Sequence, residues 1–163
     1  MILLAVWLAV QTPPPDSVTR VRWERMLHTT NDSLDRLGSA IATFRADLKT
    51  ASPPLVIQRA SQVHQACTAA NRVLTDLHAL LGSPYSAKIA QQQAAFRSNT
   101  SRMLVVLDHC QRDWSPEPGS AARADTLKAW GPYRTANLEH QVLEYVSDMR
   151  RFSKAAGLAG PGS

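Results

Sequence analysis

The sequence contains few glycines, few aromatic residues and only two cysteines. Glycine accounts for 7 of the 163 residues, the aromatic residues for 6% and charged residues for 19%. Hydrophobic residues make up 44%, which is enough for a packed core and argues against a disordered chain. The 10 prolines cluster between periodic segments, as expected of long helices joined by short breaks. The length suits one domain.

Motifs of the common enzyme and cofactor-binding families are absent. The sequence has no phosphate-binding loop, no HExxH, CxxC, CxxCH or GxSxG motif, and no EF-hand loop. It also lacks the ExxH pairs that supply ligands in di-iron helical bundles. We therefore predict that the protein is not an enzyme, and that it has no catalytic, cofactor-binding or metal-binding residues.

A hydrophobic run long enough to cross a membrane is also missing. Residues 1–10 (MILLAVWLAV) carry no charge, but as a helix they would span only about 15 Å, half of a hydrocarbon core. The run resembles the hydrophobic region of a signal peptide, so it is either an export signal or a retained anchor. Its docking candidates are Leu3, Leu4, Trp7 and Leu8. Residues 11–17 (QTPPPDS) form a proline-rich spacer, in which Asp16 or Ser17 can cap a helix.

Four segments with heptad spacing follow, and each predicts a long helix. We expect one helix from about residue 18 to 51, a second over 54–81 and a third over 84–114. A fourth should run from about 120 to 156 and either kink or restart at Gly131-Pro132. The predicted fold is all-α, an up-down-up-down four-helix bundle over residues 18–156, with a flexible tail at 157–163. The expected core includes Leu37, Ile41, Leu74, Leu77, Met103, Leu107, Val142 and Met149.

The two cysteines, Cys67 and Cys110, both lie on apolar seams. In an exported protein two cysteines usually pair. A tight turn at residues 82–84, however, would offset the two cysteines by about 11 residues along the axes of the two helices. That corresponds to roughly 16 Å, beyond the limit of about 7 Å for a disulfide. Either the connection is looser than a tight turn, or both are buried free thiols.

Basic residues occur at the start of the first helix and at the end of the fourth. The candidates are Arg20, Arg22, Arg25, Arg150, Arg151 and Lys154, and the formal net charge is +5 with a pI of about 9.7. In an antiparallel bundle these ends adjoin, beside the apolar N-terminus, so they can dock to anionic lipid or to an acidic protein. Alternatively, the cations at the end of the fourth helix complement its dipole and the arginines of the first helix are solvated. No nucleic acid is expected, because aromatic residues do not interleave with the basic ones.

The five histidines, at positions 28, 64, 78, 109 and 140, lie off the apolar seams, which predicts surface positions. Residues 26–34 (MLHTTNDSL) together with His140 resemble the Met/His ligation of the cytochrome b562 family. This resemblance implies a b-type haem electron-transfer bundle as one alternative function. A periplasmic sensor domain for a small ligand or a metal is another.

The apolar N-terminus, the basic bundle and the general build resemble the small extrinsic subunits of bacterial photosynthetic reaction-centre and antenna complexes. This resemblance implies a non-enzymatic accessory subunit in the periplasm, held by protein partners of a membrane assembly and by contact of the N-terminus with the membrane surface. Polar residues interrupt the third predicted helix at 91–93 and 98–101 (QQQ and SNTS). They either face water or form a surface for another chain.

Overall fold

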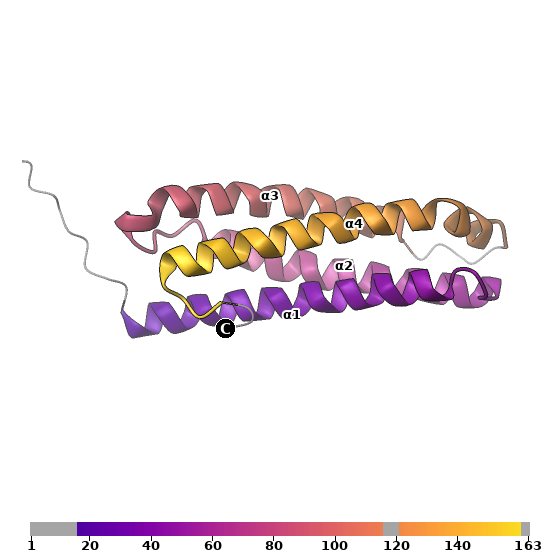
Figure 1. Ribbon diagram of the computed structural model, residues 1–163, viewed down its shortest axis with the longest axis horizontal. Helices are drawn as coiled ribbons and strands as arrows, with labels where there is room; N and C mark the ends of the chain where they lie inside the picture. The colour runs from indigo at the N-terminus through magenta and orange to yellow at the C-terminus, as the bar shows by residue number, and fades with distance from the viewer. Residues whose placement is uncertain (1–15, 116–120, 161–163) are drawn as a thin grey trace, which may run out of the picture.

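The computed structural model describes residues 16–115 and 121–160, and within them the fold is all-α. The four long helices lie side by side along the long axis of the molecule (Figure 1). Among the described residues they are accompanied by one short 3-10 helix and no strand. The elements are α1 (Ser17–Asp47), α2 (Pro53–Leu80), η1 (Ala87–Ile89), α3 (Ala90–Asp113) and α4 (Ala121–Ala156).

The first two helices begin where local chemistry favours a helix start. Asp16 caps α1, and its carboxylate accepts a hydrogen bond of 2.7 Å from the backbone N–H of Thr19. Pro53 and Pro54 open α2, where the missing N–H of proline costs nothing and its fixed φ suits the helix. The spacer and the Ser52-Pro53-Pro54 break therefore set these boundaries as the sequence predicts.

The apolar seams form one continuous core. All eight core residues predicted from the spacing are buried, which confirms the phase of the helices. The core also contains residues outside the predicted seams, namely Tyr85, Ala124, Leu127 and Leu158. Aromatic side chains gather toward both ends of it, with Trp23 against Tyr85 at 5.3 Å and Phe44 against Trp114 at 4.7 Å between ring centroids.

The connection between α2 and α3 is longer than a tight turn. Residues 81–86 and η1 separate the two helices, so the expectation of a helix from residue 84 is wrong. Gln93 holds the connection: its amide oxygen accepts from Tyr85 N, and its amide nitrogen donates to the carbonyls of Leu81 and Ser83. Because the Gln93 side chain satisfies three backbone groups of the loop, the loop packs against the first turn of α3. A tight turn therefore does not join α2 to α3.

This loop explains why the two cysteines meet. Along α2 and α3, His78 contacts Ser101 and His64 contacts the Gln111 carbonyl, each at 2.9 Å, so the helices run in opposite directions. The end of α2 then lies beside Arg97, whose Nη2 is 3.5 Å from the Cβ position of Gly82. About two turns of α3 extend past α2, which removes the predicted mismatch. Cys67 and Cys110 form a disulfide with a Cα–Cα distance of 6.1 Å, so they are not free thiols.

α4 continues through the expected kink site. It is one helix with Pro132 inside, and the Thr135 hydroxyl donates to the carbonyls of Gly131 and Pro132. Gly131 faces α1, where a Cβ would lie 2.8 Å from the Phe44 ring. A glycine is needed here because the ring of Phe44 occupies the space that a side chain would take.

α4 ends in a turn that returns the chain to the core. Gly157 has a φ of 66°, and Leu158 N donates to the Ser153 carbonyl at 2.9 Å, as in a Schellman motif. Leu158 is buried, and Ala159 N donates to Glu24 Oε1 at 3.0 Å. The first part of the expected flexible tail is therefore attached to α1, while residues 161–163 lie outside the described residues.

Candidate functional site

The candidate docking residues at the start of α1 form an exposed face. Val18 is 75% exposed and Val21 50% exposed, while Trp23 points inward and is buried. Arg22 and Arg25 are exposed on the same side, because positions 18, 21, 22 and 25 share one helix face. The outer side of this end of α1 thus combines apolar and cationic side chains.

Most of these cations have no partner among the described residues. The side chains of Arg22, Arg25, Arg150 and Lys154 form no hydrogen bond or ion pair among the described residues, and all four are exposed. Arg20 differs, because its Nε pairs with Glu24 Oε1 at 2.9 Å. Arg151 pairs with Asp148 on its own helix.

The structure brings the start of α1 and the end of α4 together. Arg20 Nη2 donates to the Gly157 carbonyl at 3.0 Å, so the two helix ends adjoin as predicted. We call this part of the molecule the basic end. The candidates Arg20, Arg22 and Arg25 lie in the first turns of α1, and Arg150, Arg151 and Lys154 lie in the last turns of α4. The apolar candidates Leu3, Leu4, Trp7 and Leu8 lie outside the described residues.

The α2–α3 connection adds a cation that the sequence analysis missed. Lys88 in η1 is exposed and lies at the basic end, because η1 lines the same hollow as Arg20 and Lys154. The spacing did not indicate Lys88 because it places residue 88 in a regular helix. The looped conformation depends on the three hydrogen bonds that Gln93 makes to the backbone.

The polar positions of α3 are partly internal. Thr100 is fully buried and shares a 2.9 Å hydrogen bond with the Tyr145 hydroxyl, while Asn99 donates to Asp148 at 2.7 Å. Burial raises the pKa of Tyr145, so its phenol stays protonated and can donate. These residues link α3 to α4, whereas Gln91 and Gln92 are exposed.

The histidines do not converge on a cofactor site. His140 is exposed and faces Glu144 at 3.3 Å, and Met26 is partly buried against the core near the other end of α4. From the Arg20–Gly157 contact, Met26 and His140 are about 11 residues, or roughly 16 Å, apart along the bundle axis. The structure therefore does not bring the two residues of the cytochrome-like pattern together. Within the described ranges, no group of three or more His, Cys, Asp or Glu could hold a metal ion.

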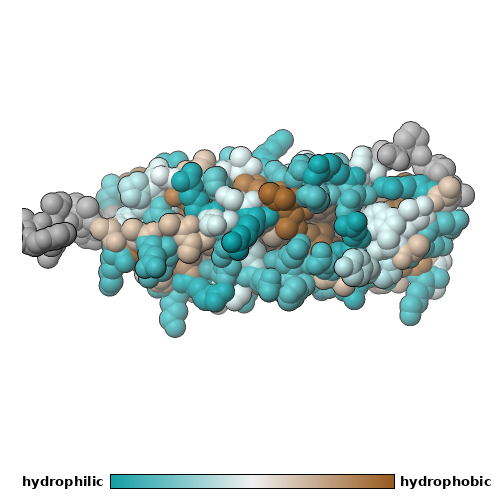
Figure 2. Space-filling model, turned by 90° about the horizontal axis from the view of Figure 1, so that it is seen from above, coloured by the Kyte–Doolittle hydropathy of each residue, from teal (hydrophilic) through white to brown (hydrophobic). Residues whose placement is uncertain are grey.

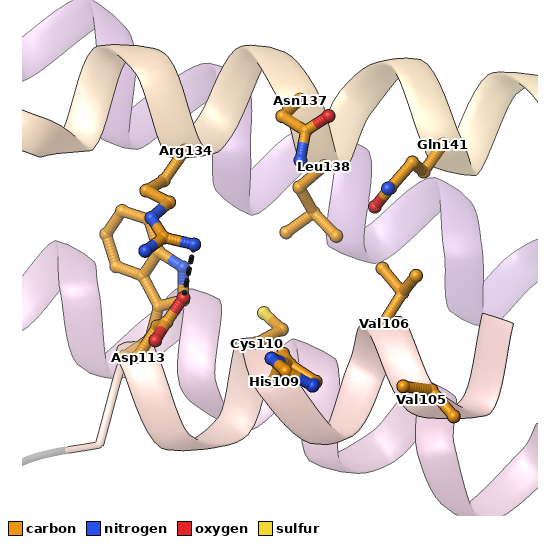
Figure 3. A pocket seen from close by; sticks show the side chains of 10 residues that line it. Val105, Val106, His109, Cys110, Asp113, Arg134, Asn137, Leu138 and Gln141 are labelled. Atoms are coloured by element: carbon orange, nitrogen blue, oxygen red, sulfur yellow. Dashed lines mark ion pairs between the residues drawn. The ribbon is translucent and has the colours of Figure 1, made fainter. Parts of the chain in front are cut away.

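A groove of about 250 Å³ lies between α3 and α4, toward the end opposite the basic end (Figure 3). Val106 and Leu138 form its apolar part, and Asp113 and Arg134 pair across it at 3.4 Å. Val105 stands exposed at its edge. Figure 2 shows a hydrophobic patch near the middle of an otherwise mainly hydrophilic face.

None of the helices among the described residues combines the length and hydropathy needed to cross a membrane. Comparison with protein-family models, with curated proteins and with solved structures finds no match.

Proposed function

We propose that the four helices form an up-down-up-down bundle. The contacts support this arrangement: α1 packs on α2, α2 on α3, and α4 on its three companions. His78 and His64 meet α3 in reverse order along the chain, and Arg20 at the start of α1 meets Gly157 after the end of α4. In the proposed arrangement successive helices alternate in direction, and the two ends of the bundle carry different residues.

We propose that the protein is a non-enzymatic interaction subunit that docks through the basic end to an anionic membrane surface or membrane-bound assembly. The observation that carries this proposal is the face of Val18, Val21, Arg22 and Arg25. Its valines are exposed and its arginines have no partner among the described residues. Residues 1–10, which are entirely apolar, precede this face.

The apolar and the basic side chains are expected to contribute differently to docking. Burying a large apolar side chain contributes about 1.5–3 kcal/mol, so several residues of the 1–10 segment together can hold the protein in place. A basic residue near an anionic membrane adds roughly 1 kcal/mol, and salt screens this contribution. The apolar residues therefore provide attachment, and the arginines orient the bundle on the surface.

An extracytoplasmic location fits the cysteine chemistry. Cys67 and Cys110 are paired, and disulfides persist mainly in oxidising compartments such as the periplasm. The apolar run at residues 1–10 supports the same location, because it resembles the hydrophobic region of an export signal. We therefore propose a periplasmic or other extracytoplasmic protein.

Sedimentation with lipid vesicles tests the docking proposal. The purified protein should bind vesicles that contain phosphatidylglycerol more tightly than vesicles of phosphatidylcholine alone. Arg22→Glu with Arg25→Glu should weaken this binding mainly at low salt, by on the order of tenfold or more. Deleting residues 1–10 should weaken it at every salt concentration.

A matched control changes one cation in α1 and one just after it, with the same change in net charge. Arg36→Glu with Lys49→Glu alters two exposed α1-side cations away from the basic end, and should leave vesicle binding nearly unchanged. If both double variants lose binding equally, only the net charge matters and the docking face is wrong. A Soret band on the purified protein would instead favour the haem alternative.

A further inference from the structure

A hollow at the basic end lies between three segments that are distant in sequence. It is lined by Arg20 of α1, by Tyr85 and the residues through η1, and by the end of α4 from Lys154 to Gly157. Its volume is about 630 Å³. We propose that this hollow binds the phosphate-bearing headgroup of an anionic phospholipid. The inference rests on the proposed docking function and names the ligand class of that same end.

Three cations surround the hollow. Lys88 and Lys154 are exposed, and neither side chain has an ion-pair partner among the described residues. Arg20 is held in place, because Glu24 and the Gly157 carbonyl accept from two of its nitrogens at 2.9 and 3.0 Å. Glu24 offsets the charge of Arg20, so the two lysines supply the excess positive charge that attracts a phosphate.

Hydroxyl groups complete the polar side of the hollow. Ser86 lines it and has no side-chain hydrogen bond within the described part of the chain. Tyr85 is nearly buried against the Trp23 ring. Burial raises the pKa of the Tyr85 phenol, so it stays uncharged and does not repel an anion. Both side chains are of a type that donates to phosphate oxygens.

Beside Lys154, the α4 side of the hollow consists of small residues. Ala155, Ala156 and Gly157 carry no long side chain, which leaves space between α4 and η1. Ile89 adds a buried apolar side chain next to Lys88. A hollow that combines cationic side chains with small and apolar ones matches a lipid headgroup with its glycerol, rather than a free ion that would need polar groups all round.

The location also favours lipid over a soluble phosphate. Val18 and Val21 are exposed at the same end, and the apolar residues 1–10 are adjacent in sequence. Contact of Val18 and Val21 with a bilayer would bring the hollow at the same end close to the lipid headgroups. A soluble phosphate compound would gain nothing from that arrangement.

The test compares two double lysine variants of the full chain. Lys88→Gln with Lys154→Gln should reduce binding to phosphatidylglycerol vesicles on the order of tenfold, because two charge contacts are lost. Lys49→Gln with Lys128→Gln removes the same charge away from the basic end, and should change binding less than twofold. NMR spectra with bicelles containing phosphatidylglycerol should show shifted amide signals at Ser86, Lys88 and Gly157.

The outcomes separate this inference from the docking proposal. If the protein binds phosphatidylglycerol vesicles but both lysine variants lose affinity equally, the headgroup site is wrong while docking stands. If the full chain does not bind these vesicles, the docking proposal itself fails and the inference fails with it. If inorganic phosphate or glycerol 3-phosphate at millimolar concentration shifts the same amides as strongly as the bicelles, the lipid assignment is overturned in favour of a soluble phosphate ligand.

Discussion

The two ends of the molecule use their charged residues differently. At the end opposite the basic end, cations pair with carboxylates on other helices: Arg59 with Asp47 at 2.6 Å, and Arg134 with Asp113 at 3.4 Å. At the basic end, four arginine and lysine side chains of the candidate set have no such partner among the described residues. The unpaired cations at the start of α1 also lie beside the exposed Val18 and Val21, and this combination is why we propose a docking function for this end.

The same ends are alike in their cores. Trp23 packs on Tyr85 and Phe152 at the basic end, and Trp114 packs on Phe44 and Trp130 at the other. Both ends therefore depend on buried aromatic area for stability. The two ends are therefore alike in the aromatic packing that stabilises them and differ in their surface charge.

The largest expected effect comes from removing one of these aromatic residues. Trp114→Ala and Trp23→Ala should each lower the free energy of unfolding by about 3–5 kcal/mol, because each leaves a cavity in the core. Chemical denaturation measures this loss. Under conditions where both variants are folded, only Trp23→Ala should weaken vesicle binding, since Trp23 supports Tyr85. Equal effects on binding would contradict the distinction between the ends.

The disulfide is expected to have the next largest effect. Replacing both Cys67 and Cys110 by serine should cost about 2–4 kcal/mol, because the bond closes a loop with a sequence separation of 43. That loop contains the α2–α3 connection of the basic end, so hydrogen exchange should accelerate there more than at the other end. Denaturation of the wild type with and without reductant gives an independent measurement.

A smaller effect is expected at Gln93. Gln93→Ala leaves the N–H of Tyr85 and two carbonyls without their partner, at a cost of about 1–3 kcal/mol. Amide exchange at residues 81–85 should become faster, and the hollow at the basic end should lose the side that η1 forms. Gln92→Ala is the control, because Gln92 is exposed one position away. If the two variants behave alike, Gln93 does not hold the loop.

The spacing of apolar residues predicted the helices and the core because burial follows the period of the helix. Leu74 and Leu107 are buried where the heptads place them. The same spacing contained a signal for the internal polar residues. Gln93, Phe96, Thr100 and Met103 are 3 or 4 positions apart, so Gln93 and Thr100 occupy seam positions. Because both residues are polar, they were interpreted as interruptions of the seam, although their positions in the heptad predict burial.

The disulfide and Lys88 could not be obtained from local patterns. Both depend on the path of residues 81–86, which is fixed by hydrogen bonds from Gln93 and not by turn residues alone. Gly82-Ser83-Pro84 indicates a break in the helix but not the length of the connection. The resemblance to extrinsic photosynthetic subunits and the membrane-docking role stay predictions.

The ion pairs and the unpaired cations are expected to differ measurably in stability. Arg59→Ala breaks the partly buried pair with Asp47 and should cost about 0.2–1 kcal/mol. Arg25→Ala should change stability within about 0.5 kcal/mol, since it is a surface substitution without a partner. Thermal unfolding of the two variants at one pH and salt concentration gives the comparison. A larger loss for Arg25→Ala would mean that the basic end also uses its cations for folding.

The smallest expected effect is a pH dependence at Glu24. The hydrogen bond from Ala159 N, followed by the contact with Arg20, holds the pKa of this carboxyl below its ordinary value of 4.5. A lowered folded pKa means that the contribution to stability is complete above about pH 4.5. It is lost as the pH falls through the folded value.

Protonation of Glu24 should also increase the difference in net positive charge between the two ends. Without its carboxylate, Arg20 loses its compensating charge and the turn at Gly157 loses the bond from Ala159. Below pH 4.5 the amide signals of Ala159 and Gly157 should therefore shift together, and Glu24→Gln should abolish this titration. Vesicle affinity of Glu24→Gln at neutral pH should exceed that of the wild type, because the basic end carries one more net positive charge. A Glu24 carboxyl that titrates at its ordinary pKa would show that the C-terminal turn is not attached to α1 in solution, and the hollow would then lack its α4 side.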